Sequence, residues 1–140
     1  MIIGIVLGAV IALCIALVVA VARDKGPGPG DVAVSYEYAW DRLDFDVLWT
    51  LSAKELRDGL DRKQFVAAKR AAYEQQPTLR GLVAHVGVDD ASVTTSGDAA
   101  LVNTSVDLRD DTTVHNVVQL ARRNSRWQVV AYRLAPTSST

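Results

Sequence analysis

Three side chains in the C-terminal part of the chain could perform acid–base chemistry, namely Asp107, His115 and Tyr132. Asp107 or His115 could act as a base, because a carboxylate accepts protons and an imidazole titrates near neutral pH. Tyr132 could donate a hydrogen bond to a developing oxyanion. This chemistry requires the groups to meet in one dry cavity. The plainer interpretation is a hydrogen-bonded, half-buried histidine and a tyrosine that packs its ring inward.

Four polar side chains of the same region would form the mouth of a ligand pocket if they shared one face of a sheet. They are Ser105, Asp107, Asn116 and Arg133. Apolar side chains continue the same face, and a cone with an apolar base and a polar mouth would produce such a gradient. The alternative is a solvated sheet surface on which Asp107 and Arg133 form a weak exposed pair.

The shared face depends on the turns, which we place at Asp110-Asp111 and Asn124-Ser125. Two-residue turns there pair Asp107 with Val114, Ser105 with Asn116, and Asn116 with Arg133. Asp-Asp is not a favoured two-residue hairpin turn, and a slip of one residue would exchange the two faces. The rival face carries Thr104, His115, Gln119 and Tyr132.

Several other classes of site are not indicated by the sequence. No nucleophile elbow, phosphate loop or dinucleotide fingerprint is present. His85 has no carboxylate or cysteine at ligand spacing, and the only cysteine, Cys14, lies in an apolar segment, so we predict neither a metal nor a cofactor. The 15 basic and 16 acidic residues are interspersed, which argues against a nucleic-acid partner.

The N-terminus predicts a membrane anchor over residues 1–22. From Ile2 to Val21 the chain carries no charge, and about 20 apolar residues suffice to span the hydrocarbon core as a helix. A cleaved signal peptide would need a basic start, which is missing. Arg23 and Lys25 follow the segment, so the positive-inside rule places the domain in the cytoplasm; an exported domain on an uncleaved anchor is the alternative.

Small residues recur every four positions along one face of the predicted anchor. They are Gly4, Gly8, Ala12, Ala16 and Ala20. Such a stripe lets a second helix approach closely, so a homodimer through the anchor is one hypothesis. The competing interpretation is that alanine and glycine are common in membrane helices.

A Gly/Pro linker over residues 23–30 is predicted to be non-helical, and Asp31 then caps a first helix. The domain covers residues 31–135, and residues 136–140 form a flexible tail. A short helical turn near Phe45 follows. Capping boxes, Ser52 with Glu55 and Asp61 with Gln64, predict two more helix starts. The longer helix runs from Arg62 towards Pro77 and presents Phe65, Ala68, Ala72 and Tyr73 inward.

Beyond Pro77 the hydrophobic pattern alternates, as expected for β-strands. Four strands are predicted, near residues 79–93, 99–109, 113–122 and 126–134. Short turns connect the last three, so they pair as antiparallel hairpins. Together these elements predict an α+β domain with helices packed on one face of a curved four-stranded antiparallel sheet.

This arrangement resembles the nuclear transport factor 2-like (NTF2-like) superfamily, whose fold is an α+β cone, and small actinobacterial membrane-tethered members are the most similar. The resemblance covers about residues 31–134 and rests on four segments: 36–40, 44–49, 56–73 and 127–130. It implies the cone fold. The superfamily includes ketosteroid isomerases, dehydratases, polyketide cyclases and proteins that only bind, so the fold does not decide the function.

We therefore predict a single-pass membrane-tethered module that binds a protein partner or an apolar small molecule, without evident catalytic machinery. One alternative is a small isomerase-, dehydratase- or cyclase-like enzyme that uses the cone pocket. Another is a structural component of a membrane assembly, in which the small-residue stripe is the main contact surface. The sequence does not identify the ligand or the partner.

Overall fold

The computed structural model describes residues 26–89 and 92–135. The predicted anchor with its small-residue stripe, residues 23–25 of the predicted linker and the predicted tail lie outside these residues. Within the described part, no helix has the length and apolar character needed to cross a membrane. The prediction of an anchor at residues 1–22 is therefore not tested by the structure.

The helical elements come first in the chain. They are α2 (Pro29–Arg42), α3 (Phe45–Leu51), the 3-10 turn η1 (Lys54–Leu56), α4 (Arg62–Tyr73) and the 3-10 turn η2 (Pro77–Leu79). The strands follow as β1 (Val83–Val88), β2 (Thr94–Ser96), β3 (Ala99–Leu108), β4 (Thr113–Arg123) and β5 (Arg126–Leu134). The α+β order predicted from the sequence is confirmed.

Helix α2 begins three residues earlier than predicted. Its N-cap is Gly28 and its first residue is Pro29, so the predicted linker is helical at its end and Asp31 is not the cap. Proline fits the first helical position because its fixed φ suits the helix and no intrahelical bond needs its missing N–H. The Asp31 carboxylate instead accepts a hydrogen bond from the Gly28 backbone N–H at 3.3 Å.

One of the two predicted capping boxes is confirmed. At the start of α4, Asp61 Oδ1 accepts from the Gln64 N–H at 2.8 Å, and Gln64 Oε1 accepts from the Asp61 N–H at 3.1 Å. The box predicted at Ser52 is wrong, because Ser52 ends α3 and forms an isolated bridge with Val129 of β5. The Ala53 N–H donates to the Val129 carbonyl at 2.8 Å, which fixes this segment to the sheet.

The sheet is antiparallel, with strand order β1-β3-β4-β5, and β2 also pairs with β3. In the described part of the stretch predicted as one strand over residues 79–93, the only strand is β1, and β2 follows from Thr94. Both lie on the same edge of β3: β1 beside Thr104 to Leu108, and β2 beside Ala99 to Leu101. The described sheet therefore has five strands where four were predicted, because this edge strand is interrupted.

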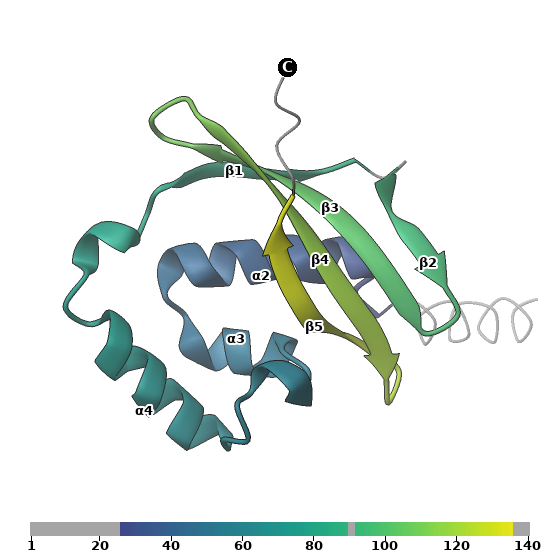
Figure 1. The fold of residues 1–140 in the computed structure, drawn as a ribbon, viewed down its shortest axis with the longest axis horizontal. Helices are drawn as coiled ribbons and strands as arrows, with labels where there is room; N and C mark the ends of the chain where they lie inside the picture. Colours follow the sequence, from purple (N-terminus) through teal and green to yellow (C-terminus); the bar gives the residue numbers. More distant parts are fainter. Residues whose placement is uncertain (1–25, 90–91, 136–140) are drawn as a thin grey trace, which may run out of the picture.

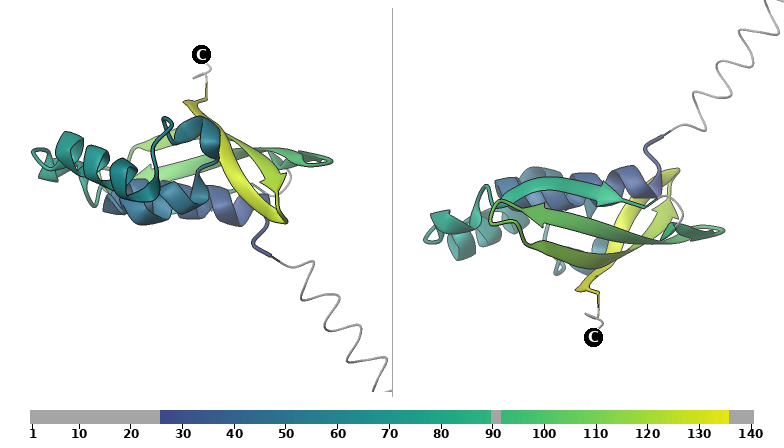
Figure 2. Two further views of the ribbon diagram at one scale, coloured as in Figure 1. Left: turned by 90° about the horizontal axis from the view of Figure 1, so that it is seen from below. Right: turned by 90° about the horizontal axis from the view of Figure 1, so that it is seen from above.

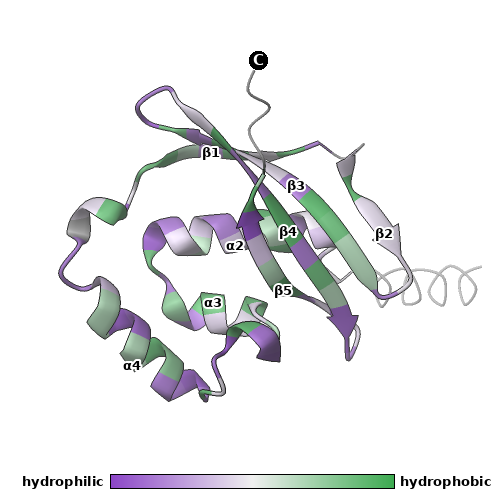
Figure 3. Ribbon diagram, in the orientation of Figure 1, coloured by the Kyte–Doolittle hydropathy of each residue, from purple (hydrophilic) through white to green (hydrophobic). Residues whose placement is uncertain are grey.

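Helices α2 and α3 lie against one face of the twisted sheet, and α4 extends beyond its edge (Figures 1 and 2). Apolar and polar segments alternate along the strands, as expected when one face is covered (Figure 3). The largest fully buried side chains are Leu48, Leu120, Val102, Val118, Val129 and Thr104. The core thus fills the space between α2, α3 and the concave face of the sheet.

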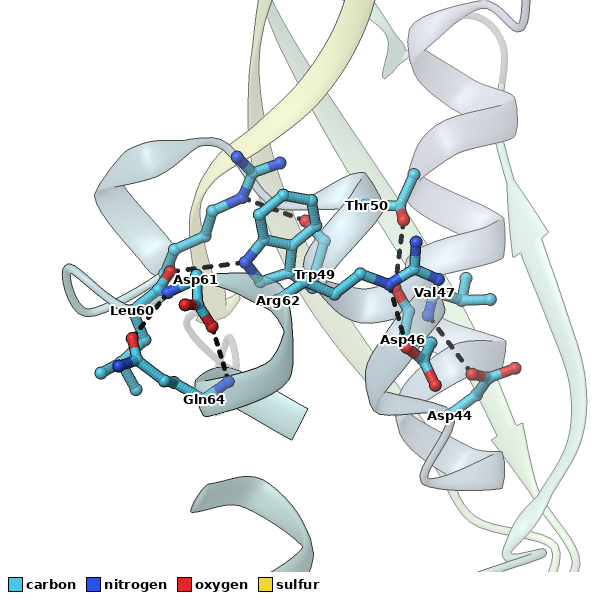
Figure 4. A network of polar contacts seen from close by, with 10 residues as sticks. Asp44, Asp46, Val47, Trp49, Thr50, Leu60, Asp61, Arg62 and Gln64 are labelled. Carbon is cyan, nitrogen blue, oxygen red and sulfur yellow. Dashed lines mark hydrogen bonds and ion pairs between the residues drawn. The ribbon is translucent and has the colours of Figure 1, made fainter. Parts of the chain in front are cut away.

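Helix α4 is attached to the domain through α3 (Figure 4). Trp49 of α3 donates its indole N–H to the Leu60 carbonyl at 3.5 Å, and the Arg57 guanidinium lies 3.7 Å from the centre of a Trp49 ring. Arg62 and Asp46 form an exposed ion pair at 3.0 Å. These contacts set the position of α4 at the edge of the molecule.

The inward face predicted for α4 is partly wrong. Phe65 is buried and Tyr73 is half-buried, whereas Ala68 and Ala72 are exposed. The reason is that the covered face of α4 runs through Phe65, Lys69 and Tyr73, which are spaced four residues apart. The Tyr73 ring at the end of α4 packs on Phe45 of α3 and Trp40 of α2.

Candidate functional site

The β3–β4 hairpin decides which polar side chains meet. Leu108 pairs with Thr112 through its N–H, which leaves a loop of three residues, and Asp111 in that loop has φ 65°. Asp107 consequently lies opposite Thr113, not Val114 as predicted. A residue in the left-handed region is typical of three-residue hairpin loops.

The β4–β5 hairpin has the two-residue turn that the sequence predicts. Asn124 and Ser125 both have positive φ, 52° and 62°, which is the geometry of a type I′ turn. A β-bulge then shifts the register, because Leu120 pairs with Val129 but Gln119 pairs with Ala131. The extra residue is Val130. Beyond such a β-bulge, the side chains of the strand point to the opposite face from the one that a regular strand would give them.

These two irregularities make the predicted pairings wrong. Ser105 lies opposite His115, and Asn116 lies opposite Thr104 on β3 and Leu134 on β5. Asn116 is therefore separated from the rest of the predicted pocket mouth.

The side chains that do meet form what we call the Glu37 cluster, which consists of Glu37, Thr104, Asn116 and Tyr132. Glu37 Oε1 accepts hydrogen bonds from the Thr104 hydroxyl at 2.8 Å and from Asn116 Nδ2 at 3.0 Å. Glu37 Oε2 accepts from the Tyr132 hydroxyl at 2.8 Å. Asn116 Nδ2 also donates to the Tyr132 oxygen at 2.8 Å. One carboxylate thus joins α2 to β3, β4 and β5.

The cluster is closed from solvent on most sides. Glu37, Thr104 and Asn116 are 5%, 1% and 3% exposed, whereas Tyr132 is 37% exposed. A buried carboxylate is costly unless it is hydrogen-bonded, and three donors here meet that requirement. The Tyr132 ring packs edge-on against Tyr36 at 5.3 Å between ring centres.

The environment keeps the Tyr132 phenol protonated. Burial raises its pKa well above the usual value, and the nearby Glu37 charge and the hydrogen bond to it act in the same direction. Burial likewise raises the pKa of Tyr36. Tyr132 is therefore suited to donate a hydrogen bond and unsuited to act as a base.

One polar atom of the cluster has no hydrogen-bond partner among the described residues. Within residues 26–89 and 92–135, the buried Asn116 Oδ1 accepts no hydrogen bond, while the amide nitrogen of Asn116 donates twice. A buried acceptor without a donor is unusual in a folded protein and marks a position where a water or ligand donor could bind.

Comparison with known proteins supports the cone fold. No protein-family model and no curated protein match the chain. Among solved structures, the chain resembles a SEC-C motif protein from Rhodopseudomonas palustris, with 19% identity, a TM-score of 0.55, and coverage of 77% of this chain and 79% of the other. It also resembles a candidate NTF2-like transpeptidase from Campylobacter jejuni, with 19% identity, a TM-score of 0.51, and coverage of 73% and 96%. The chain has the NTF2-like fold.

Within this NTF2-like domain, the predicted catalytic residues are not together. Tyr132 belongs to the Glu37 cluster, but Asp107 lies at the β3–β4 hairpin, where it accepts a hydrogen bond from the Thr113 hydroxyl at 2.8 Å. His115 is exposed and follows the opposite face from Asn116. The register places Asp107 and His115 on the outer face of the sheet and Tyr132 on the face that packs on α2, so Tyr132 is separated from both candidate bases.

The four residues predicted for the pocket mouth are also divided. Asn116 is inside the cluster, whereas Ser105, Asp107 and Arg133 alternate with inward residues and lie on the outer face. Arg133 is exposed, and Asp107 does not pair with it.

The NTF2-like domain also contains residues that the sequence analysis missed as site residues, above all Glu37. A signal was available: Glu37 lies four residues after Ala33 and three before Trp40, within the apolar face of α2. Thr104 was placed on the rival face without a role. In the described part of the chain, no three His, Cys, Asp or Glu side chains are grouped so that they could hold a metal ion.

Proposed function

We propose that this chain is a membrane-tethered binding module in which the Glu37 cluster stabilises the domain and transfers no protons. The observation that carries the proposal is the engagement of Glu37: the residue is 5% exposed, and both of its carboxylate oxygens accept hydrogen bonds from side chains of its own domain. A general base must reach the proton it removes at hydrogen-bond distance. The Glu37 carboxylate already accepts hydrogen bonds from the domain itself, and its burial leaves a substrate little access to it.

Tyr132 is engaged in the same way. Its single hydroxyl proton is donated to Glu37, and its oxygen accepts from Asn116. An oxyanion would have to displace Glu37 as the acceptor of that proton. The arrangement therefore favours a fixed hydrogen-bonded link between α2 and β5 over a free donor.

The tether is supported by the uncharged run of residues 2–21, which is long enough to span a bilayer. The described domain starts at Gly26, only a few residues later. A domain connected in this way would remain close to the membrane surface. Its orientation is proposed from Arg23 and Lys25, which favour the cytoplasmic side.

The enzyme alternative has one observation in its favour. Tyr132 is the partly exposed member of the cluster, and the unpartnered Asn116 Oδ1 lies in the same cluster. A ligand that reached Tyr132 could meet both a phenol and a buried acceptor. The experiment below separates this alternative from the proposal.

The full-length wild type and the Glu37→Gln variant should be purified from membranes and analysed by native mass spectrometry. We expect both to fractionate with membranes and to retain the same bound small molecules, because the carboxylate performs no chemistry. A molecule held intact by Glu37→Gln but found converted with the wild type would contradict the proposal and support the enzyme. Recovery of the untagged wild type entirely in the soluble fraction would contradict the tether.

A further inference from the structure

A pocket of about 360 Å³ lies outside the Glu37 cluster, beside the second half of α4. It is lined by Leu43, Phe45, Arg70, Tyr73, Glu74 and Arg80. These residues come from three places: the α2–α3 junction, the last turn of α4, and the segment after η2. A volume of this size is in the range of small-molecule sites. We call it the α4 pocket.

Two unpaired cations line the α4 pocket. In the described part of the chain, neither Arg70 nor Arg80 lies within 4.0 Å of a carboxylate, although three other arginines do. Arg80 uses its Nε to donate to the Arg42 carbonyl at 3.2 Å, which leaves its two terminal nitrogens available. With Glu74 as the only acidic residue of the lining, the pocket has an excess of positive charge.

Arg80 is held in place by the end of α2. The Asp41 carboxylate accepts from the N–H groups of Leu82 and Val83 at 2.7 and 3.0 Å, and the Asp41 carbonyl accepts from the Gly81 N–H at 3.0 Å. The backbone next to Arg80 is thus fixed before any ligand arrives. A fixed guanidinium loses less entropy on binding an anion.

The apolar side of the α4 pocket is aromatic. Phe45 and Tyr73 lie 5.9 Å apart between ring centres with their planes tilted by 35°, and Trp40 packs edge-on against both. A flat ring could pack on this surface while its charged group meets the arginines. Aromatic residues supply large contact area at low entropy cost.

The backbone at the pocket is strained. Leu43, one of the lining residues, has φ 52° and ψ 41°, a left-handed conformation that a leucine rarely adopts. Such strain concentrates where a side chain is needed at a binding surface. The chain keeps a leucine at this helix end, where glycine is the usual residue.

We propose that the α4 pocket binds a small organic anion with a flat apolar body, of the aromatic carboxylate class. Arg70 and Arg80 receive the carboxylate, and Phe45, Tyr73 and Leu43 receive the ring. Glu74 opposes the anion and limits its affinity. This inference names the ligand class for the proposed binding module and rests on that function, but it uses no residue of the Glu37 cluster.

The test uses the full-length chain in phosphatidylcholine nanodiscs, with naphthoate as the probe and the uncharged naphthamide as its matched control. Isothermal titration calorimetry measures both, and empty nanodiscs provide the blank. We expect naphthoate to bind more tightly than naphthamide. Arg70→Gln and Arg80→Gln should each raise the Kd for naphthoate by about fivefold, since both arginines are exposed and exposed charge pairs contribute modestly.

Two further variants make the test specific. Glu74→Gln should lower the Kd for naphthoate and leave that for naphthamide unchanged, because it removes only a like charge. Arg126→Gln is the matched control, since Arg126 is also exposed but lies at the β4–β5 turn and outside the lining. It should leave the Kd unchanged.

Three results would overturn the inference: no binding of naphthoate at millimolar concentration, equal affinity for naphthamide, or an equal loss with Arg126→Gln. The Glu37→Gln variant should bind naphthoate like the wild type. Catalysis at the Glu37 cluster would therefore contradict the proposed function but would not change the effect of Arg70→Gln and Arg80→Gln on naphthoate binding. A failure of the proposed function can thus be distinguished from a failure of the α4-pocket inference.

Discussion

Tyr132 of β5 donates a hydrogen bond of 2.8 Å to Glu37 of α2, two residues that are 95 positions apart in the chain. With Thr104 and Asn116 as further donors, Glu37 is the point at which α2 and three strands are joined. Apolar side chains of α2, such as Val32 and Ala33, also pack in the core, and contacts of that kind tolerate small shifts. This one requires α2 and the strands to adopt one defined position, because hydrogen bonds depend on distance and angle.

Replacing Glu37 with leucine should lower the free energy of unfolding by about 2–4 kcal/mol, because buried donors of Thr104 and Asn116 lose their acceptor. Glu37→Gln keeps an acceptor oxygen and can donate its amide to Tyr132, so a loss of about 1 kcal/mol is expected. Thermal unfolding followed by circular dichroism measures both. A leucine variant as stable as the wild type would show that the cluster contributes nothing to stability.

Stability should fall as the pH rises above about 10, the value at which an exposed tyrosine loses its proton. Burial and Glu37 raise the pKa of folded Tyr132, so the folded state keeps a proton that the unfolded state releases. The folded form then binds more protons, and the free energy of unfolding decreases with pH. Tyr132→Phe should make this alkaline decrease shallower in urea unfolding experiments.

Tyr36→Phe provides a second arm of the pH experiment, since burial raises the pKa of Tyr36 as well. The Tyr36→Phe/Tyr132→Phe double variant should show the smallest decrease in the free energy of unfolding at alkaline pH. An unchanged slope in both single variants would mean that neither phenol is perturbed by folding.

Asp61→Ala should destabilise the start of α4 by about 1 kcal/mol, because it removes the side chain that caps Gln64 N–H. Since α4 is attached mainly to α3, the effect should be local. Hydrogen exchange should become faster in α4 and stay unchanged in β3 and β4. Lys63→Ala, on an exposed position of the same helix, is the control. Equal acceleration in the sheet would contradict the local attachment of α4.

Ser125→Gly should stabilise the domain by about 0.5–1 kcal/mol, because glycine adopts the positive φ of this turn without the strain that serine bears. Ser105→Gly, in the extended part of β3, should instead be destabilising. Thermal unfolding distinguishes the two. A loss of stability in Ser125→Gly would show that the serine side chain makes a contribution that its backbone angle does not suggest.

The fold could be predicted from the sequence because its signals are local. Asp61 and Gln64 mark the start of α4, Asn124 and Ser125 mark a hairpin turn, and the change to alternating apolar residues after Pro77 marks the sheet. Each of these features depends on residues close together in the chain. The same is true of the α+β order, which requires only the succession of patterns.

The site could not be predicted because it depends on register. The β3–β4 loop has one residue more than predicted, and the β-bulge adds Val130 to β5. Together these two residues change which side chains face α2. Glu37 was missed for a different reason: a charged residue on a helix is usually solvated, and only its partners on three distant strands make its burial favourable.

The β3–β4 loop has a further consequence. Exposed turns usually accept insertions and deletions, but side chains alternate between faces with a period of two. Shortening this loop by one residue would force a strand to slip, so that Thr104 and Asn116 would point away from each other. Removing two residues would preserve the alternation. The number of residues in this exposed, acidic loop is therefore constrained to be odd. An odd number keeps Thr104 and Asn116 on the same face of the sheet, next to Glu37.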